Sequence, residues 1–378
     1  MKRYGPFRGS REKNGFRRGT SFPRATGRAL IHYKQNWRSP PVALRAECAL
    51  PHLAVLEAGR KGKIIFYEMT FEENVSLAKY SHYQIGGPSR YFFLAETEAE
   101  ALAALREARA RGLKIFILGG GTNILFADEG FDGLVLKADF KNIDVDGNEI
   151  VVGAGVAVAD LVRTAEERAL SGWEWAGGLP GTVGGALRGN AGAFGGETKN
   201  SVVTVTSINT ETLARHERSR EECRFGYRSS IFKEIGGTEL IVSARFALTP
   251  GDAAAIRAVA EKNIAYRRER HPIELPNIGS IFKNIPVERV SEAVRGAAAH
   301  AIKKDPFPVV PAAYLIAETK LGGRTHGGAM ISPKHPNFIV NTGGASAADV
   351  RALMGVVRAA VREKFSVELE PEVFEVGP

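Results

Sequence analysis

A glycine-rich segment between residues 177 and 197 places the strongest constraint on what this chain can fold into. Nine of the first twenty residues of this segment are glycine, and no acidic residue occurs in it before Glu197. Glycine allows φ > 0 and a close approach to the main chain, at a cost in conformational entropy. Flexible linkers are rich in Ser and charge, whereas this segment also holds residues that favour burial, namely Leu179, Val183, Ala186, Leu187 and Phe194. Converging backbone N–H groups are typical of a diphosphate site, so a ligand cradle is favoured over a linker.

A second glycine cluster lies upstream and follows a short apolar run. Residues 114–118 have the length and composition of a strand, and Gly119, Gly120, Gly121, Thr122 and Asn123 follow directly. A glycine turn at the end of a strand is a common way to approach a phosphate. The cluster is neither a Walker loop nor a six-residue dinucleotide fingerprint, because the required spacing is missing. Together, the two clusters predict one dinucleotide held by two loops.

The composition limits the remaining classes. A chain of 378 residues is long enough for two or three domains. It contains no run of 18 apolar residues, which argues against a transmembrane helix. Cys48 and Cys223 have neither CxxC nor metal-ligand spacing, so free thiols in a reducing compartment are expected and no metal site is predicted.

The basic character of the chain is confined to residues 1–68. Of the formal net charge of +9, this segment contributes +11, from fifteen Lys and Arg against four Glu, so the remainder carries −2. It shows no sustained period of 2 or 3.6 and is predicted to be largely disordered. A nucleic-acid arm, a targeting peptide and an extension upstream of an original start at Met69 are three open accounts, of which the third is favoured because the orderly pattern begins there.

From Met69 onward, strands and helices alternate irregularly. Residues 97–111 predict an amphipathic helix with Gly112 as its stop. Further helices are predicted over 158–169, 252–268, 314–319 and 346–365, and strands over 89–94, 114–118, 133–136, 150–155, 202–209, 240–248, 327–331, 338–341 and 367–374. This irregular order predicts an α+β class and not a single doubly wound sheet.

Six segments, in this order, resemble the UDP-N-acetylenolpyruvoylglucosamine reductase family. They are Tyr83–Pro88, Ile117–Asn123, Gly178–Glu197, Phe225–Lys233, Leu275–Asn284 and Leu369–Val373. The resemblance implies a two-subdomain FAD-binding fold of the vanillyl-alcohol-oxidase (PCMH) type plus a C-terminal α+β substrate-binding domain. Mapped onto the chain, it implies an extension at 1–68, a first FAD-binding subdomain at 69–137 to which 366–378 returns, a second at 138–250, and a substrate-binding domain at 251–365.

The resemblance also implies a chemistry and its catalytic residues. In the family, NADPH reduces FAD, and hydride then passes to the enol ether of a UDP-sugar in peptidoglycan precursor synthesis. Arg228 matches the family arginine, whose fork suits a carboxylate or enolate. Ser280 matches the proton donor, and Glu372 matches a glutamate expected close to Arg228. Without the resemblance, each of the three has an ordinary alternative as a surface ion pair, a turn serine and an exposed glutamate.

The remaining site residues follow from the same resemblance. A UDP-sugar substrate, a monomeric cytoplasmic enzyme, no membrane contact and no nucleic acid on the body of the chain are implied. The predicted cofactor-binding residues are Gly119, Gly120, Gly121, Thr122, Asn123, Gly178, Pro180, Gly181, Thr182, Gly184, Asn190 and Gly192. The predicted substrate-binding residues are Tyr227, Arg268, Lys283, Asn284 and Glu318.

Three features depart from the family pattern. The basic extension has no counterpart, residues 285–311 are longer than in compact members with an elbow expected at 306–308, and Glu318 stands where glutamine is common. Two alternatives stay open: another FAD-dependent oxidase or dehydrogenase of the same superfamily, and a basic RNA-binding module that uses residues 1–68.

Overall fold

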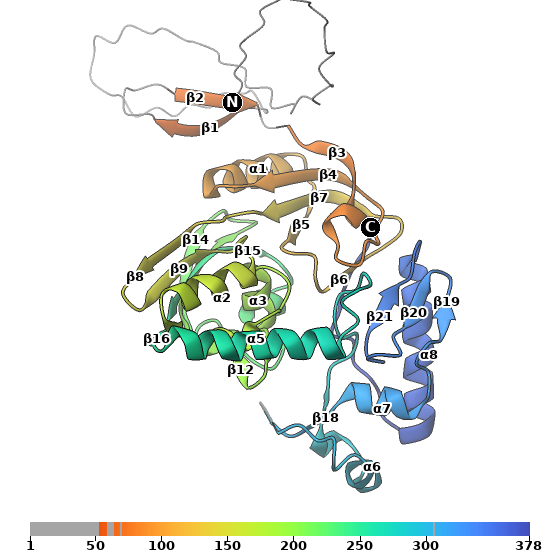
Figure 1. Ribbon diagram of the computed structural model, residues 1–378. Coiled ribbons are helices and arrows are strands. Elements are labelled where there is room, and N and C mark those ends of the chain that lie inside the picture. The colour runs from red at the N-terminus through yellow and green to blue at the C-terminus, as the bar shows by residue number, and fades with distance from the viewer. Residues whose placement is uncertain (1–52, 59–63, 69, 305–306) are drawn as a thin grey trace, which may run out of the picture.

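The computed structural model describes residues 53–58, 64–68, 70–304 and 307–378 (Figure 1). Cys48, most of the basic extension and part of the expected elbow at 306–308 therefore lie outside the described residues. Within the extension, strands β1 (Leu53–Ala58) and β2 (Ile64–Glu68) pair antiparallel. These two strands are the only part of the segment 1–68 that the structure describes, and the disorder of the rest stays a prediction.

The first sheet has four strands in the order β3-β4-β7-β5. These are β3 (Glu72–Ser76), β4 (Pro88–Ala95), β5 (Lys114–Leu118) and β7 (Phe131–Ala138), and β7 runs parallel to both of its neighbours. Helix α1 (Glu98–Ala110) connects β4 to β5 and begins with a capping box between Thr97 and Glu100. The predicted helix at 97–111 is confirmed. Because β5 ends at Leu118, the sheet presents the glycine cluster 119–123 at its edge.

The second sheet is antiparallel, with five strands in the order β14-β13-β15-β9-β8. They are β8 (Ile143–Asp146), β9 (Glu149–Gly153), β13 (Val202–Asn209), β14 (Arg215–Ser219) and β15 (Glu239–Ala247). Helices α2 (Val158–Glu167), α3 (Val183–Gly189) and α5 (Ala253–Arg270) lie together on one side of this sheet (Figure 1). A single apolar core joins the two sheets, so the two glycine clusters belong to one packed unit.

The C-terminal part has its own core. It contains α7 (Ala312–Glu318), α8 (Ala347–Phe365) and a small sheet of β19 (Thr325–His326), β20 (Ala329–Ile331) and β21 (Ile339–Asn341). Tyr83 ties this part to the N-terminal sheet, since its hydroxyl donates to the Ile339 carbonyl at 2.7 Å. The chain then returns, and β22 (Phe374–Val376) pairs parallel with β6 (Ile124–Phe126).

The closing strand is shorter than predicted. Residues 367–374 were expected to be extended, but regular pairing is limited to β22, and Pro371 makes one isolated bridge with Phe282. Pro371 has no N–H to continue a ladder. The remaining elements are short: β10 (Leu170–Ser171), β11 (Gly192–Ala193), β12 (Gly196–Glu197), β16 (Thr249–Pro250), β17 (Ile285–Pro286), β18 (Val309–Val310), α4 (Ile231–Glu234), α6 (Glu292–Ala297), η1 (Leu77–Tyr80), η2 (Glu174–Ala176), η3 (Thr198–Asn200) and η4 (Val287–Arg289).

Neither membrane spans nor metal clusters occur in the described part of the chain. None of the helices there is both long enough and apolar enough to cross a bilayer. The same residues contain no group of three or more His, Cys, Asp or Glu side chains arranged to hold a metal ion. Cys223 is buried as a free thiol, and burial raises its pKa to about 12. Cys223 is therefore an inert packing residue.

Candidate active site

The two glycine clusters touch each other. A Cβ added at Gly120 would lie 2.8 Å from the Gly181 Cα, and one added at Gly119 would lie 2.9 Å from the Thr182 Oγ1. Gly181 has φ +111, a conformation that other residues rarely adopt. Larger side chains at these positions would push the loops apart, so the glycines are needed for the contact itself.

The first loop presents unused hydrogen-bond donors. The backbone N–H groups of Gly120, Gly121 and Thr122 donate to no backbone carbonyl among the described residues. Gly121 has φ +65, and its Cα faces the Tyr80 carbonyl so closely that an added Cβ would lie only 2.0 Å from that oxygen. Buried backbone donors are almost always satisfied. A run of free N–H groups in a glycine-lined turn therefore fits an anionic phosphate ligand.

The second loop, residues 177–197, contains a short helix that was not predicted from the sequence. Helix α3 begins at Val183, with Thr182 as its N-cap accepting from the Gly185 N–H at 3.4 Å. Gly178 has φ +71 and Pro180 is exposed, so these two residues shape the entry to the helix. The sequence gives little sign of α3 because its glycines have a low intrinsic helix propensity. Burial of Val183 and Leu187 overcomes that low propensity.

Three of the predicted cofactor residues use their polar groups inside the protein. The Asn190 amide donates to Gly226 O at 2.9 Å and to Glu197 Oε1 at 3.2 Å, and its oxygen accepts from Lys199 N at 3.1 Å. Gly184 N donates to the Ala154 carbonyl, and the Gly192 carbonyl accepts from Arg228. These hydrogen bonds hold the loops in place, and the direct contact of the three residues with a cofactor stays a prediction.

Arg228 and Glu372 meet across the molecule. Arg228 Nε lies 2.8 Å from Glu372 Oε1, and one terminal nitrogen donates to the Gly192 carbonyl at 2.9 Å. Arg228 has φ +53, and Lys233 Nζ donates to its carbonyl at 2.8 Å. A non-glycine residue held at positive φ is uncommon and is often found at functional sites. The guanidinium is therefore held in a fixed orientation, with donor capacity left over.

The loop that contains Ser280 runs beside Glu372. Glu372 N donates to the Ile281 carbonyl at 2.7 Å, and Lys283 N donates to the Glu370 carbonyl at 3.0 Å. On the other side, Asn337 clamps the same loop through both backbone groups of Phe282, at 3.0 Å and 2.9 Å. Ser280 is half-buried and follows Gly279, around which a Cβ would meet open space. The structure therefore brings Arg228, Glu372 and the Ser280 loop to one place.

Tyr227, Asn284 and Lys283 surround this group. Burial raises the Tyr227 pKa, while the nearby Arg228 and hydrogen bonds with Asn284 act in the opposite direction. The Asn284 side-chain oxygen also accepts from Ala312 N at 3.2 Å, which ties the start of α7 to the site. Lys283 Nζ lies 3.2 Å from Glu370 Oε2 and is therefore partly neutralised. Asn123, at the end of the first loop, joins the same region because its amide donates to the Glu372 carbonyl at 3.1 Å.

The predicted substrate contact of Arg268 stays a prediction, and its neighbour Arg267 has the more buried position on α5. Arg268 is exposed on α5 and makes no side-chain ion pair among the described residues, whereas Arg267 points inward. Arg267 Nε donates to the Gly177 carbonyl at 2.9 Å, its guanidinium lies 5.1 Å from the centre of the Phe194 ring, and burial lowers its pKa to about 10. The helical period could have found it, because the buried stripe of Ile256, Ala260 and Asn263 continues at position 267.

Glu318 lies away from the group around Arg228. It is at the C-terminal end of α7, whereas Asn284 contacts the opposite end of the same helix. Its carboxylate lies 3.4 Å from Lys364 Nζ, and its backbone carbonyl also accepts from that amine. A contact of Glu318 with the substrate therefore stays a prediction. The charge that replaces glutamine here is balanced by α8.

A surplus of positive charge surrounds the site. Burial lowers the pKa values of Lys233 and Arg188, and Lys233 is further affected by Lys283 and Arg188. Lys233 was not assigned a site role from sequence, although it closes the Phe225–Lys233 motif and lies one turn after Arg228. Glu372 is half-buried among these cations, and its single carboxylate cannot balance the charges of all of them. A cluster of cations of this kind favours a ligand with several negative charges.

Two family models match the chain in the regions that build this site. Residues 89–212 match the FAD binding domain, which spans both glycine loops. Residues 271–375 match the C-terminal domain of UDP-N-acetylenolpyruvoylglucosamine reductase, which carries Ser280 and Glu372. The fold and the site thus define an FAD-dependent oxidoreductase of the α+β, two-subdomain type, as predicted.

Relatives over most of the chain make the assignment narrower. A UDP-N-acetylenolpyruvoylglucosamine reductase of Lactobacillus acidophilus is 34% identical, covering 81% of this chain and 95% of that protein. One from Carboxydothermus hydrogenoformans is 38% identical over 81% of this chain and 93% of that protein. The crystal structure of the Thermus caldophilus reductase superposes with a TM-score of 0.65 at 31% identity, covering 81% of this chain and 99% of that one. The chain belongs to the UDP-N-acetylenolpyruvoylglucosamine reductase family, and the resemblance read from the sequence is confirmed.

Proposed function

We propose that this enzyme uses NADPH to reduce the enolpyruvyl ether of UDP-N-acetylglucosamine-enolpyruvate to UDP-N-acetylmuramate, a peptidoglycan precursor. The observation that carries the proposal is the contact of Arg228 Nε with Glu372 Oε1 at 2.8 Å beside the Ser280 loop. Family membership and the phosphate-compatible glycine loops support it. The proposed reaction uses a redox cofactor next to a group of cations whose charge is opposite to that of the substrate.

The chain's own residues would hold the cofactor through its diphosphate. Gly120, Gly121 and Thr122 offer free N–H groups, and the second loop contributes the adjoining wall at Gly178, Gly181 and Thr182. FAD, when bound, would accept hydride from NADPH and deliver it to C3 of the enolpyruvyl group.

Arg228 would stabilise the charge that hydride addition creates. As the C3–H bond forms, the electrons of the C2–C3 double bond move onto C2 and its carboxylate. The guanidinium is fixed by Glu372, by the Gly192 carbonyl and by its own backbone conformation, so it offers a preorganised donor to that anion. Preorganisation lowers the barrier because the dipoles need not reorganise during the reaction.

Ser280 would complete the reaction as the proton donor. Its hydroxyl proton passes to C2, and solvent then returns a proton to the serine oxygen. A serine hydroxyl is a weak acid, so it depends on position more than on acidity. The clamp of its loop between Asn337 and the 370–372 backbone provides that position.

The two half-reactions test this assignment separately. Ser280→Ala should leave flavin reduction by NADPH intact while slowing reoxidation by the enolpyruvyl sugar nucleotide on the order of 10²-fold or more. Stopped-flow absorbance follows each step. Ser243→Ala, at a half-buried serine of β15, is the matched control and should behave as the unmodified protein. An equal fall in both half-reactions would remove Ser280 from the role of proton donor.

A further inference from the structure

The glycine-rich segment contains a single charged residue before Glu197. Arg188 is the only charged residue between positions 177 and 196, and the first loop, residues 119–123, contains none. Arg188 lies in the last turn of α3, the helix that begins in the second loop, and it is half-buried. A diphosphate is a multiply charged anion, whereas backbone N–H groups provide only partial positive charges. Arg188 is therefore the one full positive charge that the two loops themselves contain.

The side chain of Arg188 extends from the second loop to the residues that flank the first. Its guanidinium carbon lies 4.8 Å from the centre of the Phe374 ring. The Phe374 N–H donates to the carbonyl of Asn123, the last residue of the first loop, at 3.0 Å. The Phe374 ring also lies nearly parallel to the ring of Phe116, with centres 6.2 Å apart, and Phe116 belongs to β5, which leads into the first loop. Arg188 therefore lies beside both ends of the first loop.

The main chain of Arg188 is fixed next to the reaction site. Its carbonyl accepts from the Ser230 hydroxyl at 2.7 Å, and Ser230 lies two residues after Arg228. The Phe374 ring under its guanidinium belongs to the residue two positions after Glu372. The backbone of Arg188 is thus tied to the loop of one member of the Arg228–Glu372 pair, and its side chain contacts the strand of the other.

The guanidinium of Arg188 has no anionic partner in the described part of the chain. It makes neither an ion pair nor a side-chain hydrogen bond there, and its one close contact is the Phe374 ring, which is 38% exposed. The nearby Glu372 carboxylate is bonded to Arg228. Burial lowers the pKa of Arg188, as expected for a cation that leaves water without a counter-charge. A bound anion would complete this arrangement.

A second cation close to the first loop is already matched. Lys137 Nζ donates to the Gly119 carbonyl at 3.4 Å and lies 3.7 Å from Asp139 Oδ1. Lys137 therefore supports the start of the loop from within the protein. Arg188 differs from it because the whole planar fork of its guanidinium is free.

We propose that Arg188 binds the diphosphate of FAD and adds a full positive charge to a cofactor site whose two loops otherwise offer only backbone donors. The cation–π contact with Phe374 holds the guanidinium in place, so that its fork can donate two parallel hydrogen bonds to phosphate oxygens. This inference rests on the cofactor of the proposed function and is independent of the identity of the sugar nucleotide.

Release of FAD from the holoenzyme on dilution, followed by the fluorescence of the free flavin, tests the inference without turnover. Arg188→Met removes the charge but keeps an unbranched side chain that can pack on Phe374, and it should weaken FAD binding by roughly 10- to 100-fold. Arg188→Lys keeps the charge without the fork, so its affinity should lie between those of Arg188→Met and the unmodified protein. Arg168→Met, at the exposed C-cap of α2, is the matched control and should stay within about twofold.

Two further measurements separate a phosphate contact from a packing role. Added salt should weaken FAD binding in the unmodified protein, and this dependence should be flatter in Arg188→Met because one charged contact is missing. The midpoint potential of the bound flavin should be the same in both proteins, since the diphosphate lies away from the isoalloxazine ring. Thermal unfolding at saturating FAD shows whether each variant is folded. If Arg188→Met does not fold, Arg188→Lys decides, and an affinity equal to that of the unmodified protein would count against the fork.

Each contrary result has a distinct meaning. Unchanged FAD affinity in Arg188→Met, or an equal loss in Arg168→Met, would overturn the inference. A shifted midpoint potential with unchanged FAD affinity would also overturn it and would assign Arg188 to the isoalloxazine ring, and a raised KM alone would assign it to a substrate. If FAD binding depends on Arg188 but the enolpyruvyl compound is never reduced, the inference stands and the proposed function fails.

Discussion

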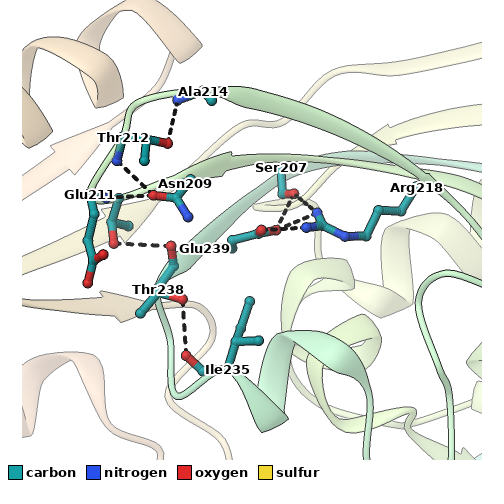
Figure 2. Close-up of polar contacts among 10 residues, drawn as sticks. Ser207, Asn209, Glu211, Thr212, Ala214, Arg218, Ile235, Thr238 and Glu239 are labelled. Carbon is teal, nitrogen blue, oxygen red and sulfur yellow. Dashed lines mark hydrogen bonds and ion pairs between the residues drawn. The ribbon is translucent and has the colours of Figure 1, made fainter.

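Two of the arginine–glutamate pairs in the described residues differ in their surroundings, and comparing them separates a structural contact from a reactive one. Figure 2 shows the first pair, Arg218 on β14 and Glu239 on β15, the two strands that flank β13 in the second sheet. Two nitrogens of Arg218 each lie 2.6 Å from one oxygen of Glu239, and Ser207 bonds to both partners. The Glu239 side chain is only 4% exposed. Both charges are fully matched, so this pair has nothing left to offer a ligand.

The second pair, Arg228 and Glu372, is open. It makes a single 2.8 Å contact, its side chains are 24% and 19% exposed, and Arg228 is held at positive φ. Further cations surround the Arg228–Glu372 pair. The Arg218–Glu239 pair is instead completed by hydrogen bonds with Ser207. A buried pair with complete hydrogen bonding is strongly destabilised by loss of one partner, whereas an open pair can exchange a partner for substrate. The number of unmatched donors, and not the ion pair itself, distinguishes a site from a structural contact.

The largest expected effect is the loss of activity in Arg228→Lys. Lysine keeps the charge opposite Glu372 but loses the planar fork, so kcat should fall on the order of 10²- to 10³-fold, as for loss of one preorganised donor. Stability should change by less than about 1 kcal/mol because the pair is partly exposed. Steady-state kinetics and chemical denaturation measure the two quantities. Near-normal turnover would remove Arg228 from the site and end the contrast.

Arg218→Met should show the opposite pattern. Glu239 would be left buried without its partner, which costs about 3–5 kcal/mol of unfolding free energy, while turnover per folded molecule stays unchanged. Arg215→Met, on the same strand, removes an exposed pair with Glu98 and should cost less than about 1 kcal/mol. Equal losses in the two variants would show that the closed pair is not special.

A smaller effect should separate two neighbouring arginines of α5. Arg267→Met removes the inward cation and should raise the KM for the sugar nucleotide by about tenfold or more. Arg268→Met, whose side chain is exposed, should leave KM within about twofold. Equal KM values in the two variants would show that the inward position of Arg267 gives it no special part in binding the sugar nucleotide.

The smallest expected effect is a pH dependence of stability that arises near the open pair. Burial lowers the pKa values of His271 and His335 to about 4, from 6.5. The unfolded chain therefore binds more protons between about pH 6.5 and pH 4, so stability contributed by the neutral histidines is complete above that window and is lost as pH falls through it. Lys303, Arg267 and Lys334 are the charged neighbours of His271 that add to this shift.

Denaturation at several pH values, in the unmodified protein and in the double variant His271→Gln, His335→Gln, checks this prediction. The double variant should have a flatter pH dependence between pH 4 and 6.5 than the unmodified protein. Parallel curves would show that the histidines titrate normally. The Arg218→Met variant should retain the slope of the unmodified protein, because the closed pair has no part in it.

Local patterns allowed much of this fold to be predicted. The 202–209 strand and the 97–111 helix are confirmed because alternation and a capping box are encoded within a few residues. The two glycine clusters predicted a dinucleotide site, and the resemblance of six segments in order implied the family and its FAD-binding fold. These signals depend on local geometry or on motif order, which a sequence displays directly.

The remaining features depend on contacts between distant segments. The phase of α5, which turns Arg267 inward and Arg268 outward, follows from packing on Gly177 and Gly178. Helix α3 forms within a glycine-rich stretch because tertiary burial outweighs weak propensity. For Glu318, motif position alone does not show which end of α7 meets Asn284. The closed and open pairs likewise have the same composition and differ only in their neighbours.

The most direct test of the account is the visible spectrum of the purified protein during a single cycle. We expect a flavin spectrum that bleaches on anaerobic addition of NADPH and returns when UDP-N-acetylglucosamine-enolpyruvate is added, at a rate that Arg228→Lys slows and Arg218→Lys does not. A colourless protein that FAD fails to reconstitute would contradict the account, as would a reduced flavin that the enolpyruvyl compound leaves unchanged.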